Sequence, residues 1–116
     1  MKTLLKLEDA AEFLVAIFVF TRLDFAWWWF PALILLPDLS MIGYLFNTKT
    51  GAMLYNLFHH KGLALLIAVT GFIIGNQSVM LAGTILFSHS AMDRMFGYGL
   101  KYDDDFKHTH LGQIGK

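Results

Sequence analysis

Acidic and imidazole side chains interrupt otherwise apolar stretches of this sequence, and these residue types can bind metals. The set comprises Glu12, Asp38, His59, His60, His89 and Asp93. Imidazoles and carboxylates together suit a divalent metal such as Zn, Mn or Fe, and the chain has no cysteine that could supply a thiolate. Such a metal lowers the pKa of bound water and polarises a phosphoryl or acyl oxygen. We therefore predict a His/carboxylate metal site in which Glu12 acts as the general base.

The spacing of these residues favours particular partners. His89 and Asp93 are four residues apart and share one face of a helix. They could be two ligands of one metal, or an acid that orients an imidazole through its second nitrogen. His59 and His60 are adjacent and would lie about 100° apart on a helix, so only one can face the site. Structural hydrogen bonding remains the alternative for each of these residues.

Two further candidate ligands, His108 and His110, lie in a polar tail at residues 99–116. In extended backbone the side chains of residues i and i+2 point to the same side, which suits two ligands of one metal. Apolar residues of the tail could hold it folded over the site. The alternative is that both histidines are simply solvated.

No linear motif specifies the reaction. The sequence has no H-E-x-x-H motif, no repeated E-x-x-H and no glycine-rich phosphate loop. Three function classes therefore stay open. The first is a metal-dependent hydrolase acting on a lipid-like or amphiphilic ester or phosphoester. The second is a non-catalytic protein that binds or conducts an ion or proton, or holds a homo-oligomer together, and the third is a metal-dependent oxidase or hydroxylase.

The elements that must position these residues are predicted to be helices. Four apolar stretches, residues 4–21, 25–46, 52–74 and 79–98, are each close to the roughly 20 residues that span a bilayer core. Short polar connections rich in turn residues separate them. Pro37 precedes Asp38 and predicts a break in the second helix, because proline lacks an amide donor. The predicted fold is all-α: an integral-membrane, four-helix antiparallel bundle forming one domain over residues 1–116, with a cytoplasmic C-terminal tail.

The composition agrees with a membrane protein and excludes two other classes. Hydrophobic residues make up 56% of the 116 residues and charged residues only 16%, and residues 62–92 contain no Asp, Glu, Lys or Arg. This much apolar surface excludes a disordered chain. The formal net charge of zero argues against nucleic acid as a partner. A soluble bundle is less favoured than a membrane one, because the last two predicted helices have no charged face.

The distribution of basic residues predicts the orientation. With four crossings, all but one of the nine Lys and Arg residues lie toward the side that holds both termini, and Arg22 lies on the other side. Positive charge favours the cytoplasmic side, so we expect a multi-pass protein of the bacterial inner membrane with both termini in the cytoplasm. At about 1.5 Å per residue, Asp38, the histidine pair and His89 all lie roughly 10–14 Å inside that cytoplasmic face.

Several segments resemble a known family: Trp27-Trp28-Trp29-Phe30, Leu36-Pro37-Asp38-Leu39-Ser40-Met41, Tyr55-Asn56-Leu57-Phe58-His59-His60-Lys61-Gly62, Gly97-Tyr98-Gly99-Leu100-Lys101-Tyr102 and Phe106-Lys107-His108-Thr109-His110-Leu111-Gly112. Together they closely resemble the domain of unknown function 4260 family of small bacterial membrane proteins. The resemblance covers nearly the whole chain. It implies a multi-pass membrane protein and no established activity.

A looser similarity is to bacterial inner-membrane proteins regarded as metal-dependent hydrolases. Those proteins combine a Leu-Pro-Asp segment with a later His-Arg-x-x-Thr-His-Ser motif. Leu36-Pro37-Asp38 matches the first part, whereas His59-His60-Lys61-Gly62 and His89-Ser90 match only fragments of the second. This similarity implies Asp38, His60 and His89 as residues of a metal site.

Overall fold

The computed structural model describes residues 2–96, 100, 108–109 and 111–113. The helices are α1 (Lys2–Thr21), α2 (Trp29–Leu33), the 3₁₀-helix η1 (Leu36–Leu45), α3 (Thr48–Phe58), α4 (Lys61–Ile74) and α5 (Gln77–Met95). Two short antiparallel strands follow, β1 (His108–Thr109) and β2 (Gly112–Gln113). Apart from this strand pair, the regular elements of the described residues are all helical, which confirms the all-α part of the predicted fold class.

Two of the four predicted helices are each broken in two. Residues 25–46 form α2 and η1, with the break next to Pro37 as predicted. Residues 52–74 were expected to form one helix, and this prediction was wrong: α3 and α4 meet at a bend of 44°. The bend arises because His59 ends α3, and the side chain of His60 then accepts a hydrogen bond from the Leu63 amide and caps α4.

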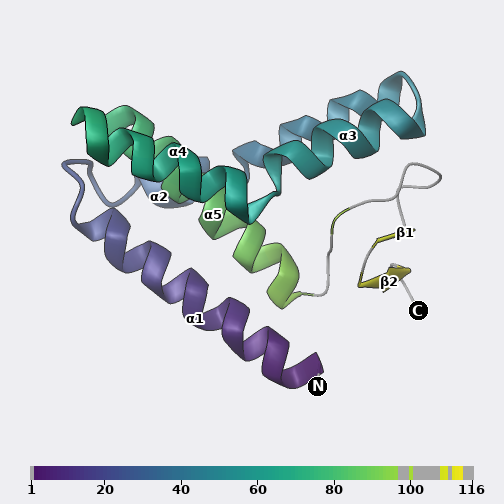
Figure 1. Ribbon diagram of the computed structural model, residues 1–116, viewed down its shortest axis with the longest axis horizontal. Coiled ribbons are helices and arrows are strands. Elements are labelled where there is room, and N and C mark those ends of the chain that lie inside the picture. The colour runs from purple at the N-terminus through teal and green to yellow at the C-terminus, as the bar shows by residue number, and fades with distance from the viewer. Residues whose placement is uncertain (1, 97–99, 101–107, 110, 114–116) are drawn as a thin grey trace.

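Helix α5 is the centre of the arrangement (Figure 1). Helices α1 and α4 both pack against α5, whereas α3 packs mainly against η1. The pair formed by α3 and η1 projects away from the body formed by α1, α4 and α5. The start of η1 and the end of α3 are therefore where the pair joins the body.

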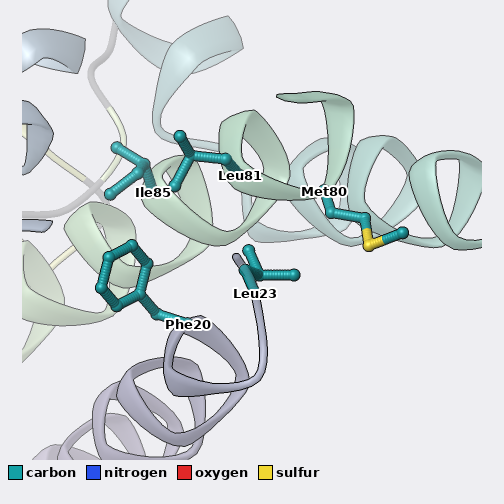
Figure 2. Packing of buried hydrophobic residues seen from close by; sticks show 5 residues of the cluster. All are labelled: Phe20, Leu23, Met80, Leu81 and Ile85. Atoms are coloured by element: carbon teal, nitrogen blue, oxygen red, sulfur yellow. The ribbon is translucent and has the colours of Figure 1, made fainter. Parts of the chain in front are cut away.

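A small apolar core joins the end of α1 to the first half of α5 (Figure 2). Its buried members are Phe20, Leu23, Met80, Leu81 and Ile85. Partly buried residues from the segment that contains α2 pack against this cluster, including Phe30, whose ring centroid lies 5.3 Å from that of Phe20. The core therefore anchors α2, and with it the start of η1, against α5.

Helices α4 and α5 approach each other closely through small residues. A Cβ atom at Gly83 would lie 2.3 Å from the backbone nitrogen of Ala68, and one at Gly71 would lie 2.5 Å from the nitrogen of Met80. Gly75 links the two helices with a φ of 69°, a conformation that glycine adopts without strain. Close backbone approach through small residues is typical of helix pairs in membranes.

Large apolar side chains cover much of the surface of the described residues. On α4, Leu66 is 67% exposed and Ile73 is 78% exposed. Apolar surface on this scale marks contact with a membrane or another protein. By length and composition, none of the described helices alone would cross a bilayer, whereas the bent pair of α3 and α4 could do so. The described helices therefore do not provide the four separate spans that the sequence predicted.

The close contact between α4 and α5 predicts the effect of enlarging Gly83. We expect Gly83→Val to lower the free energy of unfolding by about 1–3 kcal/mol, because the added carbons meet the Ala68 backbone, which cannot move aside cheaply. Thermal unfolding of the detergent-solubilised protein measures this effect. Ala82→Val, at an exposed neighbouring position on the same helix, is the matched control and should change stability much less. Equal losses in the two variants would contradict the close approach.

Candidate metal centre

Four of the predicted ligands converge where the projecting pair of helices joins the body. They are Asp38 in the first turn of η1, His59 at the end of α3, and His89 and Asp93 on α5. Each offers one ligand atom, and these four atoms all lie within 4.8 Å of one another. Residues from three separate elements thus meet at one point.

The four ligand atoms form a ring in which nitrogens and oxygens alternate. Nε2 of His89 lies 2.9 Å from Oδ1 of Asp38 and 3.4 Å from Oδ2 of Asp93. Nε2 of His59 lies 3.3 Å from each of the same two oxygens. Around a tetrahedral Zn²⁺ with bonds of about 2.1 Å, all six pairs of ligand atoms lie about 3.4 Å apart, whereas the two pairs across this ring lie within 4.8 Å. The four neighbouring distances in this ring are close to that spacing.

The second nitrogen of each imidazole is held by a backbone carbonyl. Nδ1 of His89 lies 2.5 Å from the carbonyl oxygen of Ile34, and Nδ1 of His59 lies 2.8 Å from that of Tyr55. A carbonyl oxygen only accepts hydrogen bonds, so both Nδ1 atoms carry the proton and donate it. In neutral imidazoles each Nε2 then presents a lone pair to the carboxylates. Four acceptors that face one another need a cation between them, which can be a metal ion or added protons.

Pro37 explains why the Ile34 carbonyl is free to accept from His89. In the 3₁₀ pattern the amide of Asp38 bonds to the carbonyl of Leu35, so the carbonyl of Ile34 would pair with the amide of residue 37. Proline has no amide hydrogen, and this pairing cannot form. The break in the chain therefore both places Asp38 and supplies the carbonyl that orients His89.

Tyr55 and Arg94 contact two of the proposed ligands, Asp93 and His59, from outside the ring of ligand atoms. The hydroxyl of Tyr55 donates to Oδ2 of Asp93 at 2.9 Å, and its ring stacks on that of His59 with centroids 3.8 Å apart. Arg94 donates to the backbone carbonyl of His59 at 3.2 Å. These contacts fix the positions of His59 and Asp93 before any ion binds, as the outer hydrogen bonds of metal sites commonly do.

Access to the site is one-sided. The two imidazoles are fully buried, the side chain of Asp93 is 12% exposed, and that of Asp38 is 34% exposed. A water molecule or substrate would therefore reach the ring of ligand atoms beside Asp38.

The other predicted site residues lie elsewhere in the structure. Glu12 is bound to Lys61 with an Oε1–Nζ distance of 2.8 Å, and Lys61 also contacts Asp9, so this group links α1 to α4. His60 is exposed and caps α4. The side chain of His108 and all of His110 lie outside the described residues.

Two contributors to the site have only weak signals in the sequence. Tyr55 lies one turn before His59, which indicates contact with that histidine but not with Asp93. The Ile34 carbonyl could be found only by noticing that a proline follows three residues later. The distant contact of Arg94 with the His59 carbonyl has no signal in the sequence.

Comparison with known proteins identifies one family. The family described as Domain of unknown function (DUF4260) matches residues 2–114. No curated protein and no solved structure matches the chain. The looser similarity to inner-membrane hydrolases is not found in these comparisons.

The role of Pro37 predicts the effect of restoring its amide. In Pro37→Ala the new N–H can bond to the Ile34 carbonyl and compete with His89, so we expect divalent metal affinity to fall about 10-fold or more. Competition with a chromogenic chelator measures this affinity for Zn²⁺. Pro31→Ala removes the other proline, which is exposed in α2, and should leave the affinity unchanged. If both variants bind Zn²⁺ like the unmodified protein, the carbonyl does not orient His89.

Proposed function

The protein belongs to the DUF4260 family, since the match covers nearly its whole length, and we propose that it is a membrane-bound, metal-dependent hydrolase. In this proposal one divalent ion is bound by Asp38, His59, His89 and Asp93. The observation that carries the proposal is the ring of four acceptor atoms with neighbouring distances of 2.9–3.4 Å. The outer hydrogen bonds on both imidazoles support it.

The alternative is a purely protonic cluster. The 2.9 Å contact between His89 and Asp38 has the length of a charge-assisted hydrogen bond, so two imidazolium ions could balance the two carboxylates. Three of the four neighbouring distances, however, are 3.3–3.4 Å, which is longer than the about 2.7–2.9 Å of a charge-assisted hydrogen bond and close to the spacing of ligand atoms around one ion. A single divalent ion balances both carboxylates and leaves the imidazoles neutral. This reasoning favours the metal.

The types of ligand atom narrow the choice of metal. Two nitrogens and two oxygens without a thiolate suit Zn, Mn or Fe. Four protein ligands fill a tetrahedral site, so water or substrate would take a fifth position on the ion, and the partly exposed Asp38 side is where that position would lie. The ion would activate water and polarise the substrate oxygen.

Hydrolysis requires little further chemistry from the chain itself. The oxygen of water joins the acyl carbon or phosphorus of the substrate and the ester bond breaks. One proton of the water leaves with the alcohol, and the other is released from the acid product to solvent. Tyr55 and Arg94 would keep Asp93 and His59 in place during these steps. The role of general base that the sequence suggests for Glu12 stays a prediction, and in the structure its carboxylate is paired with Lys61.

We further propose that the chain is embedded in the bacterial inner membrane with its basic residues toward the cytoplasm. The exposed apolar side chains of α1, η1, α3 and α4 support this placement, as does the bent apolar pair α3–α4. The close approach of α4 and α5 through glycine is also usual between helices in lipid. A site beneath the membrane surface would take amphiphilic rather than freely soluble substrates.

The metal site predicts a contrast between two adjacent histidines. His59→Ala should lower Zn²⁺ affinity at least 100-fold, because it removes a ligand, whereas His60→Ala should bind Zn²⁺ normally. Metal content per chain, measured by atomic emission on protein purified in detergent, should be close to one in the unmodified protein and in His60→Ala.

The other outcomes of this experiment separate the alternatives. No metal in any variant after loading with Zn²⁺, Mn²⁺ and Fe²⁺ would reject the metal site and favour the protonic cluster. Bound metal without turnover of amphiphilic nitrophenyl esters or phosphoesters would reject hydrolysis alone. Loss of metal from His60→Ala but not from His59→Ala would reject the assigned ligands.

The membrane placement predicts how the protein fractionates. After the membranes are washed at high pH, the protein should stay in the pellet, because its apolar surface is embedded in lipid rather than held by charge. Immunoblotting of pellet and supernatant measures this partition. A known peripheral membrane protein in the same sample is the control and should be released. Release of this protein into the supernatant would contradict membrane embedding.

A further inference from the structure

An apolar cavity of about 370 Å³ is lined by residues of the same helices that carry the proposed metal ligands. Its walls come from α2, η1, α3 and α5, and they include Leu33, Pro37, Phe58, Leu81, Ala82 and Ile85. Ligand pockets in proteins usually begin at about 300 Å³, so the cavity has room for a small ligand.

The four proposed ligands do not themselves line the cavity, but three of its wall residues neighbour them along the chain. Pro37 and Phe58 both line the cavity, and each directly precedes a proposed ligand, Asp38 and His59 respectively. Ile85 also lines it and lies one turn before His89 on α5. A molecule in the cavity could thus extend one end to the half-exposed side of the site.

The cavity is long and lacks polar partners. Its α5 wall is formed by residues 78, 81, 82, 85 and 86, which follow one face of the helix over about 12 Å. Among the described residues that line it, only Ser78 has a polar side chain, and Ser78 lies at the end farthest along α5 from His89. Such walls favour an extended apolar group and offer nothing to a charged or hydrogen-bonding one.

We propose that this cavity binds the alkyl chain of an amphiphilic substrate whose ester or phosphoester head lies at Asp38. The inference rests on the proposed function and names its substrate class: single-chain amphiphiles whose chain lies along α5. The occupant is the chain of the substrate and not that of a bilayer lipid, because two wall residues, Pro37 and Phe58, directly precede two of the proposed ligands.

Alkyl hydroxamates test the inference, because their head groups bind metals and their chains can be varied. The protein would be loaded with Co²⁺ in lipid nanodiscs, and binding of acetohydroxamate and octanohydroxamate would be followed by the visible spectrum of the ion. We expect octanohydroxamate to bind at least 10-fold more tightly than acetohydroxamate. In Ala82→Phe, which fills the cavity, this ratio should fall at least 5-fold while acetohydroxamate binds as before.

A matched variant controls for partition of the alkyl chain into the bilayer. Ala32→Phe adds the same ring at an exposed position of α2 that does not line the cavity, and it should keep the ratio of the unmodified protein. Partition of the chain into lipid is the same for both variants, so only the cavity can separate them. An unchanged ratio in Ala82→Phe would overturn the inference while leaving the metal site intact.

A second measurement locates the chain without relying on the metal. An octyl hydroxamate with a diazirine at its chain end would be photoactivated with the Co²⁺-loaded and the metal-free protein. Labelling concentrated between Ser78 and Leu86 in either form supports the cavity. Labelling spread over the exposed leucines of α4 in both forms overturns it. If Co²⁺ fails to bind but residues 78–86 are labelled, the proposed function fails and chain binding alone is supported.

Discussion

The structure depends on four hydrogen-bond acceptors that face one another inside the protein. Two carboxylate oxygens and two imidazole nitrogens alternate around a ring, and neutral imidazoles have no proton to place between them because their other nitrogens already donate to backbone carbonyls. Such an arrangement is costly unless a cation balances it. Since the ligands come from η1, α3 and α5, the same cation would tie the projecting pair of helices to the body of the molecule.

The two breaks in the helices serve this site. At the first, Pro37 leaves the Ile34 carbonyl without a backbone donor, and His89 uses it. At the second, His59 ends α3 and its own Nδ1 bonds to the carbonyl of Tyr55. A continuous helix would have used the Ile34 carbonyl in its own ladder. The Tyr55 carbonyl accepts both the helical bond from the His59 amide and the bond from Nδ1. In the proposed membrane setting such an interruption is tolerated, because another group of the protein, here His89, satisfies the freed carbonyl.

The fold was predictable to the extent that local sequence decides it. Apolar stretches bounded by turn residues predicted helices, and Pro37 predicted one break, because proline acts within its own turn of chain. The bend at His59 and His60 was missed, since a histidine followed by a lysine is compatible with a continuing helix. The bent pair and the exposed apolar residues are the two observations that support the proposed membrane placement. The small core that includes Phe20 and Leu81 lies where the end of α1 meets the first half of α5.

The sequence by itself determined which chemistry the site can offer: carboxylates and imidazoles without thiolates, with His89 and Asp93 paired on one helix face by their spacing. It also placed Asp38 beside a break. Only the tertiary structure decided that His59, and not His60, joins the other ligands. On an isolated helix either histidine could face the site, and the bend directs His59 to the site while His60 caps α4. It likewise paired Glu12 with Lys61 and aimed Tyr55 at Asp93. The partners in these two contacts are separated by 38 and 49 positions along the chain, and no local rule of spacing can specify such contacts.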